Sequence, residues 1–435
     1  MARRGVDELV AGMVLAEDVL TPGGRFLMPR GTVLDAGHLK SLQAWNVLEA
    51  SVEAGDVAEG QALSPAGDAA TSRADAWEAT VAAIQDGVRE RLRHVDATSP
   101  AGKTLFSLAV DRELARLEHG ATGRSGEDAA RLVTSPDSPS LPPVSAEAML
   151  RDEPQLVSPP EVYSRVSRVL RDPASTVEDA ADAIRHDQSL AAKLLRLVNS
   201  SFYARTMRAV NGRFPTKVDS LSRAVMVVGA RQLSTLALGV SVLPLFQDIP
   251  QGWVNMRLFW EHSVGCAVAA QAIAYATRRG NPETLFVGGL MHDIGRIILF
   301  KQAPQHMAAA MRRALSDRVP LTVAETQVLS FDHAALGGLL LHKWEFPTHL
   351  ETMVSHHHAL AGEHIEEQAI IHLADALANA LAWGGSGSRY VPALDPRTFD
   401  VIGLAPQTLA ELLPEMEANL TETMRGFFPE HEGIA

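Results

Sequence analysis

Apolar residues along the chain follow two periods, and the change between them divides the chain into parts. Residues 1–52 hold short β-branched apolar runs interrupted by turn-forming residues, which is typical of small β structure. Thr21–Gly24 is a hairpin-turn signal, and Arg25–Leu34 predicts a second strand pair around a turn of its own. His38–Trp45 predicts a short helix. We therefore predict a small β-rich N-terminal module.

Helical spacing of apolar residues begins at about Asp75 and continues through a helical segment, residues 74–118. Leu105–Leu117 predicts the second of its two helices. The apolar stripe of the first helix could form a homodimer contact or, as is more usual, pack on its own chain. Residues 53–73 predict a linker, and residues 119–150 a disordered linker, because both are rich in small and polar residues. The stripe consists of Trp77, Val81, Ile84, Val88 and Leu92.

Residues 151–380 keep the helical period and contain no alternating strand pattern of useful length after residue 160. This pattern predicts an all-α helical bundle. Inside it, Ser175 and Glu178 fit a capping box at the start of a helix. Residues 381–435 are again amphipathic in part and predict a helical extension that packs on the bundle. The fold class is therefore mainly α, with a helical bundle that follows the β-rich module and a helical linker region.

Composition narrows the class of protein. With 435 residues and 46% apolar residues, the chain can form two or three domains. A net charge of −13 argues against general nucleic-acid binding. The one cysteine, Cys266, excludes a disulfide framework and a thiolate zinc site, and predicts a reducing, cytoplasmic location. We expect no signal peptide, because the N-terminus has no long apolar core. We also expect no membrane span, because the longest apolar stretch, Leu233–Phe246, is short and contains Pro244.

The pair His292-Asp293 lies inside the apolar run 288–300 and is the strongest chemical feature of the sequence. An imidazole beside a carboxylate suits a divalent metal ion, whereas burying the pair without compensation is costly. A core histidine beside a solvated aspartate is the alternative for the pair alone. Further imidazoles and a carboxylate lie on or beside apolar helical patterns, enough for one or two metal ions in a bundle. They are His262, His333, the run His356–His358, and Asp375.

The order of these residues resembles that in the HD superfamily of metal-dependent phosphohydrolases. Residues 187–203, 220–229 and 333–347 resemble the signature of HDOD domains, the HD-related output domains of bacterial signalling proteins. The resemblance extends from about Leu156 to Ala380 and implies an HD-like all-α bundle. The N-terminal module is similar to the small domain often found before HD-GYP and HDOD modules.

The resemblance also implies two sets of ligands for divalent metal, which could be Mn, Fe, Zn or Mg. The first set is His262, His292, Asp293 and Asp375. The second, in relatives with two ions, is His333 with a His-His pair. The family spacing after the proline at 347 selects His357 and His358 for that pair, although the sequence alone leaves open which two of the three consecutive histidines take part.

Catalytic HD-GYP relatives, which hydrolyse cyclic di-GMP, differ from this chain at three points. The Asp-Gly-x-Gly-Tyr-Pro loop after the histidine pair is missing. Arg296 replaces a lysine and could contact a phosphate, but it cannot give up its proton. Leu258 replaces a glutamate one turn before His262. Efficient hydrolysis of cyclic di-GMP is therefore not expected.

Two hypotheses follow for function. In the first, the chain is a signal-transduction output protein that binds a metal and transmits its state to a protein partner. In the second, it is a metal-dependent phosphohydrolase acting on a nucleotide or cyclic dinucleotide. Seven basic and two acidic residues between Asp187 and Arg223 could hold a phosphate group or an acidic partner, or they could form a solvated face. The basic residues are Lys193, Arg196, Arg205, Arg208, Arg213, Lys217 and Arg223.

Overall fold

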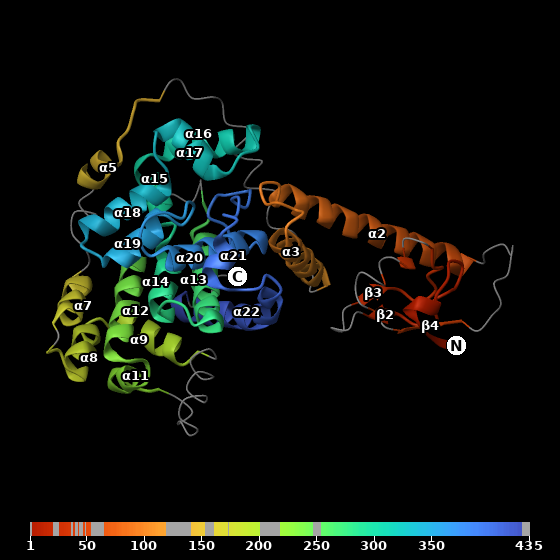
Figure 1. Cartoon of the computed structure of the whole chain (residues 1–435), viewed down its shortest axis with the longest axis horizontal. Helices are drawn as coiled ribbons and strands as arrows, with labels where there is room; N and C mark the ends of the chain where they lie inside the picture. The colour runs from red at the N-terminus through yellow and green to blue at the C-terminus, as the bar shows by residue number, and fades with distance from the viewer. Residues whose placement is uncertain are drawn as a thin grey trace, which may run out of the picture. The chain divides into compact units, whose positions relative to one another are not determined.

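A computed structural model describes residues 2–20, 26–35, 38–39, 42, 47, 49–53, 65–118, 141–152, 161–172, 174–200, 218–246 and 254–428 (Figure 1). The chain forms two compact units. One comprises Met1–Val88 with Val110–Thr122, and the other comprises Arg89–Ala109 with Gly123–Ala435. Each unit therefore takes part of the two helices α2 (Pro65–Arg91) and α3 (Pro100–Glu118).

The first unit contains two short antiparallel strand pairs. The strand β1 (Ala2–Gly5) pairs with β4 (Glu49–Val52), and β2 (Val19–Leu20) pairs with β3 (Phe26–Met28). A single turn of 3-10 helix, η1 (Val6–Glu8), follows β1. Strands in the N-terminal module were predicted, whereas the β1–β4 pair was not. The predicted turn at residues 21–24 and most of the predicted helix at 38–45 lie outside the described residues.

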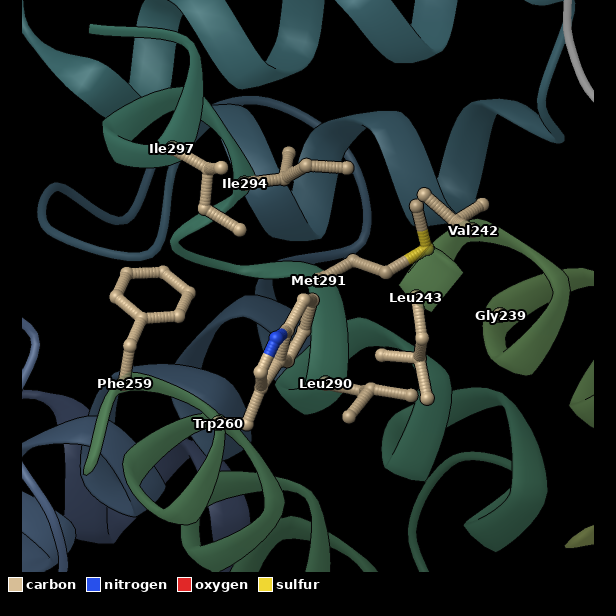
Figure 2. A pocket seen from close by; sticks show the side chains of 9 residues that line it. All are labelled: Gly239, Val242, Leu243, Phe259, Trp260, Leu290, Met291, Ile294 and Ile297. Atoms are coloured by element: carbon tan, nitrogen blue, oxygen red, sulfur yellow. The ribbon is translucent and has the colours of Figure 1, made fainter. Parts of the chain in front are cut away.

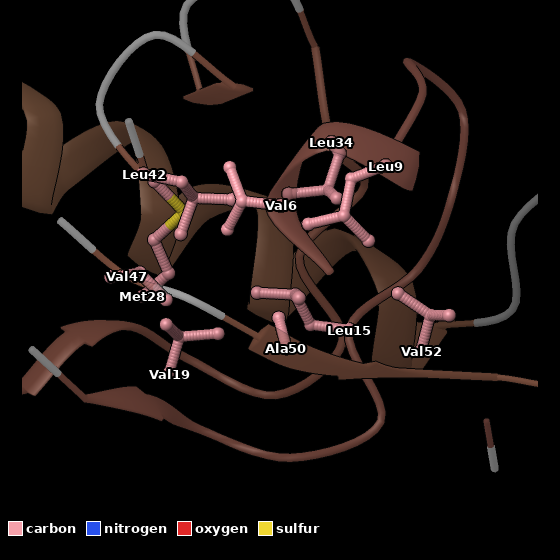
Figure 3. Packing of buried hydrophobic residues seen from close by; sticks show 10 residues of the cluster. All are labelled: Val6, Leu9, Leu15, Val19, Met28, Leu34, Leu42, Val47, Ala50 and Val52. Carbon is pink, nitrogen blue, oxygen red and sulfur yellow. The ribbon is translucent and has the colours of Figure 1, made fainter. Parts of the chain in front are cut away.

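Apolar side chains from all parts of the N-terminal module meet in one small core (Figure 3). Alternate residues of β4 are buried, because successive side chains of a strand point to opposite faces. This core is what lets so short a segment hold its strands together. Its buried members are Val6, Leu9, Leu15, Val19, Met28, Leu34, Leu42, Val47, Ala50 and Val52.

The predicted linkers need correction. The linker predicted at residues 53–73 ends at residue 64 at the latest, because α2 begins at Pro65. Its alanines favour helix, and proline is well tolerated in the first turn. Helix α3 likewise begins at Pro100, five residues before its predicted start, with Ser99 Oγ accepting from the Gly102 amide at 3.0 Å. The disordered linker predicted at 119–150 is wrong at its end, where α5 (Ala146–Asp152) forms.

The second unit is a helical bundle, as predicted, and its described residues contain no β-strand. Its N-terminal half consists of α7 (Glu161–Arg171), α8 (Val177–Arg185), α9 (Gln188–Val198), α11 (Leu221–Val228), α12 (Ala230–Val242) and η2 (Leu243–Phe246). The following helices are α13 (Met256–Thr277), α14 (Pro282–Met291), α15 (Ile294–Gln302), α16 (Pro304–Ser316) and α17 (Leu321–Leu329). The last are α18 (His333–Lys343), α19 (Thr348–Ser355), α20 (Ile365–Ala380), α21 (Thr398–Ile402) and α22 (Thr408–Phe427).

Two details differ from or extend the sequence predictions. The capping box of α8 is formed by Thr176 and Asp179, not by Ser175 and Glu178. Both pairs fit the same spacing, and the hydrogen bonds form between Thr176 and Asp179. The C-terminal helix α22 packs against α13 and α9, and Arg196 donates to the carbonyl of Gly426 at 3.0 Å.

Helix α13 is the centre of the bundle and packs against α14, α20 and α22 (Figure 1). Its contact with α14 is close because Gly289 has no side chain. A Cβ at Gly289 would lie 2.7 Å from the Cα of Ala267 and 2.8 Å from its backbone nitrogen. Backbone atoms cannot move aside cheaply, so this glycine sets the distance between the two helices.

Gly289→Ala should therefore destabilise the bundle by about 3 kcal/mol, since an overpacked core side chain forces the backbone apart. Gly385→Ala is the matched control, because a Cβ at Gly385 meets no atom within 4 Å. Urea unfolding followed by circular dichroism would measure both. Equal midpoints for the two variants would contradict the close contact.

Membrane spans were also sought among the described residues. No single helix there has the length and apolar character to cross a membrane. The helices α11 and α12 meet the criterion only as a pair, and the pair is bent by 115°.

Candidate metal centre

Seven imidazole and carboxylate side chains from separate elements converge inside the bundle. Helix α13 supplies His262, and the junction of α14 and α15 supplies His292 and Asp293. His333 opens α18, and Asp375 lies on α20. The two remaining members follow the end of α19, and they are His357 and His358.

One half of this donor cluster surrounds Asp375. His262 Nε2 lies 3.2 Å from Asp375 Oδ1 and 3.7 Å from Asp293 Oδ2. His292 Nε2 lies 3.5 Å and 3.4 Å from the same two oxygens. These four side chains are the first predicted ligand set, and the structure brings them together.

The other half consists of three histidines. His333 Nε2 lies 3.1 Å from His358 Nε2, 3.3 Å from His357 Nε2 and 3.0 Å from Asp293 Oδ1. Asp293 therefore faces both halves, with Oδ2 toward the first and Oδ1 toward the second. His356 is turned elsewhere, with its Nδ1 2.7 Å from Ser355 Oγ. Of the three consecutive histidines, the geometry selects the pair that the family spacing indicates.

Three groups within this donor cluster have the geometry of a metal site. In each group, one ligand atom per residue lies within 4.8 Å of the others. The search covers the described residues only. The groups are His262–His292–Asp293, His333–His357–His358, and His292–His357–Asp375.

The donor cluster also has the unpaired atoms that a metal would use. His262 Nε2, His292 Nε2, Asp293 Oδ1 and His358 Nδ1 are buried and have no hydrogen-bond partner of good geometry among the described residues. Leaving such atoms unpaired inside a protein costs free energy. A divalent ion takes imidazole nitrogens and carboxylate oxygens as ligands, so the residues present fit such an ion.

The carboxylates of the donor cluster are ionised. Burial alone would raise the pKa of Asp293, but the charge of Arg296, with those of His292 and His333, outweighs burial and holds it well below the usual range. Burial also opposes ionisation of Asp375, and the rings of His262 and His292 lower its pKa well below normal. Both side chains therefore offer the charged form that ligates metal.

Four histidines of the donor cluster fall into two classes by the direction in which their pKa is shifted. Burial lowers the pKa of His357 and His358 well below normal, and neighbouring imidazoles lower it further, so both rings are neutral. Burial and Arg296 oppose protonation of His333, yet Glu325 and Asp293 raise its pKa to about 9. The pKa of His292 is also raised well above its ordinary value, against burial, by its neighbours Cys266, Asp293 and Asp375. Metal binding would therefore displace protons from one class and not from the other.

Sequence reasoning missed several residues that hold the donor side chains in place. Glu325 on α17 is fully buried and contacts His333. Asn379 donates to Asp375 Oδ1 at 2.7 Å, one turn further along α20. His372 donates from Nδ1 to the carbonyl of His357 at 2.7 Å. A charged residue such as Glu325 inside the apolar run of α17 was the available signal, since buried charges need partners.

Arg296, predicted as a possible phosphate contact, lies beside the donor cluster but is occupied. Its Nη1 donates to Asp293 Oδ2 at 2.7 Å and to Ser386 Oγ at 2.5 Å, and the side chain is buried. The predicted basic group between Asp187 and Arg223 lies largely outside the described residues. Of its described members, Arg196 caps the end of α22 and Arg223 pairs with Asp219.

A small cavity with an almost entirely apolar lining lies next to the donor-bearing elements (Figure 2). Its walls come from residues that flank the donor residues in sequence, such as Trp260 before His262, and Met291 and Ile294 around the His-Asp pair. None of the lining residues has an imidazole or carboxylate side chain, so the cavity adds no metal donor to the cluster. The complete lining is Gly239, Val242, Leu243, Phe259, Trp260, Leu290, Met291, Ile294 and Ile297.

Comparison with known proteins bears on the family and the fold of the bundle. A model of the HDOD domain family matches residues 156–360. The structure is similar to that of an HDOD domain protein from Geobacter sulfurreducens, with a TM-score of 0.51 and 20% identity over 66% of this chain and 97% of that one. It is also similar to a protein from Shewanella amazonensis SB2B that is named as a candidate phosphohydrolase, with a TM-score of 0.50 and 21% identity over 65% and 97%. At these identities the likeness establishes the fold.

One curated relative also matches, a protein of Treponema pallidum (strain Nichols) whose name assigns no function. It is 24% identical over 294 residues, which are 63% of this chain and 52% of that protein. The chain thus spans about half the length of this curated relative.

The all-α bundle and its internal cluster of histidines and aspartates define an HD-like domain. Within that class, the family match is specific: residues 156–360 of this chain form an HDOD domain.

Proposed function

We propose that the chain is a signal-transduction output protein whose HDOD domain binds one or two divalent metal ions and transmits its state to a protein partner. The observation that carries the proposal is the closed, buried donor cluster with its unpaired nitrogens and oxygen. One ion would be held by His262, His292, Asp293 and Asp375. A second would be held by His333, His357 and His358, with Asp293 between the two.

Burial favours a signalling role over turnover. Six of the seven side chains are at most 3% exposed, and His358 is 11% exposed. A substrate would need more access than this. Helix α18, in contrast, carries both the buried His333 at its start and Leu339, which is 37% exposed. A change at the donor cluster can therefore reach the surface through one rigid element.

Hydrogen exchange on the metal-free and metal-loaded protein tests this proposal. An output module must change the protection of surface elements, so we expect slower exchange in α18 and α19 as well as around the ligands. If only the ligand residues gain protection, the metal site would be purely structural.

Two further expectations stay predictions. One is dimerisation through the apolar stripe on α2. The other is the division of the chain into a module at 1–52, a bundle at 151–380 and a C-terminal extension.

A phosphohydrolase is the second candidate, and the complete set of seven donor side chains favours it. A bound divalent ion supplies positive charge that polarises a phosphoryl oxygen. His358, the most exposed member, would face an incoming nucleotide or cyclic dinucleotide. Arg296 would have to leave Asp293 and Ser386 to contact a phosphate, which weighs against this role.

We expect no hydrolysis of cyclic di-GMP above the background of the metal-free protein when Mn or Fe is saturating. The physical reason is the closed donor cluster together with a guanidinium that is already paired. Chromatographic detection of linear dinucleotide over time is the measurement, with His292→Ala as the control. Product that forms with the wild-type chain and disappears in His292→Ala would make the enzyme the better reading.

A further inference from the structure

We infer that Glu325 is the positioning residue for the three-histidine half of the donor cluster: it holds His333 so that Nε2 faces Asp293, His357 and His358. The inference rests on the metal binding proposed above and deepens it. It concerns a residue on α17, eight positions before His333 and outside the ligand set.

One carboxylate oxygen of Glu325 makes both of its hydrogen bonds to the same residue, His333. Its Oε2 accepts from His333 Nδ1 at 2.6 Å and from the backbone amide of the same residue at 3.0 Å. Both side chains are fully buried. One carboxylate oxygen therefore fixes the ring and the backbone of a single histidine at the start of α18.

This arrangement decides which ring nitrogen is available. Because Nδ1–H donates its hydrogen bond to Glu325, Nε2 is the ring nitrogen that faces the interior of the cluster, 3.0 Å from Asp293 Oδ1. A carboxylate behind a ligating histidine fixes its orientation and increases its basicity. His292 and His357 instead donate from Nδ1 to the carbonyls of Gly289 and Val354, both at 2.7 Å.

Glu325 is also connected to the other side of the donor cluster. Its Oε1 lies 3.5 Å from Arg296 Nε, and Arg296 in turn donates to Asp293 Oδ2. The side chains of Glu325, Arg296 and Asp293 thus form a row of alternating charge, which ends at the aspartate that faces both halves. This connection gives the buried guanidinium a second anionic neighbour, which a buried charge requires.

The backbone of His333 is fixed from the opposite side as well. A Cβ at Gly295 would lie 2.0 Å from the His333 carbonyl oxygen, so α15 and α18 touch at this point. The backbone of His333 is therefore held by packing even when its ring is not. Replacing Glu325 should accordingly release the imidazole without unfolding the start of α18.

Cobalt titration of the metal-free full chain, followed by absorption and by metal analysis, tests the inference. Glu325→Gln keeps one oxygen that can accept both hydrogen bonds but loses the charge, so the affinity for one of two ions should fall about 10- to 100-fold. Glu325→Leu removes the hydrogen bonds and should lose that ion. His262→Ala belongs to the other half, so combining it with Glu325→Gln should weaken both ions.

The matched control is Glu351→Gln. Glu351 Oε2 pairs with His342 Nδ1 at 3.2 Å, the same chemistry at the protein surface, and its loss should leave both ions in place. If Glu325→Gln binds both ions as the wild type does, or if both weaken equally, Glu325 is not a positioning residue. If the wild type binds one ion and the Glu325 variants bind that ion equally well, the inference alone is overturned. A wild type that binds none overturns the proposed function too.

A second readout needs no metal. Proton NMR spectra of the metal-free protein should show the resonance of the Nδ1 proton of His333 far downfield, because its partner is a buried carboxylate. The signal should move in Glu325→Gln and vanish in Glu325→Leu, while Glu351→Gln leaves it in place. An unchanged signal in Glu325→Leu would contradict the assignment.

Discussion

Replacing Asp293 by alanine should leave the chain without bound metal. Each oxygen of Asp293 faces a different half of the donor cluster: Oδ2 lies 3.4 Å from His292 Nε2 and Oδ1 lies 3.0 Å from His333 Nε2. Its loss removes an anionic group from both halves and takes from the buried Arg296 the nearer of its two ion-pair partners, leaving Glu325 at 3.5 Å. We expect affinity to fall by at least about 100-fold, more than for loss of a residue behind the ligands.

Elemental analysis of protein purified without a metal-binding tag is the measurement. About one or two metals per chain are expected in the wild type and none in Asp293→Ala. Asp317→Ala is the matched control, since Asp317 is an exposed carboxylate paired with Arg313. Equal metal content in the wild type and Asp293→Ala would refute a shared carboxylate, and circular dichroism would show whether the variant is folded.

Much of this donor cluster could be predicted from sequence because its members lie in local patterns. His292 and Asp293 are adjacent in an apolar run, and the pair His357 and His358 follows a fixed distance after Pro347. A family resemblance then supplies the rest of the set. The geometry adds which two of the three consecutive histidines face the cluster. They are His357 and His358, since His356 pairs with Ser355 instead.

The residues that could not be predicted act through tertiary contacts. Glu325 on α17 contacts His333 at the start of α18, and no periodicity marks the two residues as partners. The close approach at Gly289 has the same origin, since the sequence does not show that its neighbour is Ala267. Local signals also permit near-misses, as when the capping-box spacing fitted Ser175 but the hydrogen bonds formed at Thr176.

The helix predictions show what periodicity can and cannot give. The apolar stripe located α2 correctly, yet the helix extends back to Pro65 because alanine-rich sequence favours helix even without an apolar stripe. Small residues were read as linker there. The spacing of apolar residues in the sequence predicts which side of a helix is buried. The ends of the helix depend instead on caps and on helix propensities summed over many residues.

Chelation should lower the thermal stability of the HDOD domain. The donor cluster holds two buried carboxylates, and at least four of its polar atoms have no hydrogen-bond partner among the described residues. A ligand that binds only the folded state stabilises it by mass action, about 2.7 kcal/mol when its concentration is 100 times its dissociation constant. For a domain of this size that corresponds to a decrease of roughly 5–10 °C in Tm on chelation.

Differential scanning calorimetry with and without a strong chelator would measure the shift. Asp293→Ala, which should hold no metal, is the control and should show the same Tm in both conditions. Adding back Mn or Zn to the chelated wild type should restore its Tm, because the ligands are still present. A wild-type Tm that chelator does not change, in protein proven to contain metal, would mean that the folded chain gains no stability from the ion. The buried nitrogens and oxygens of the donor cluster would then need hydrogen-bond partners other than a metal ion. Catalysis on a substrate would become the better explanation of why the seven donor side chains lie together.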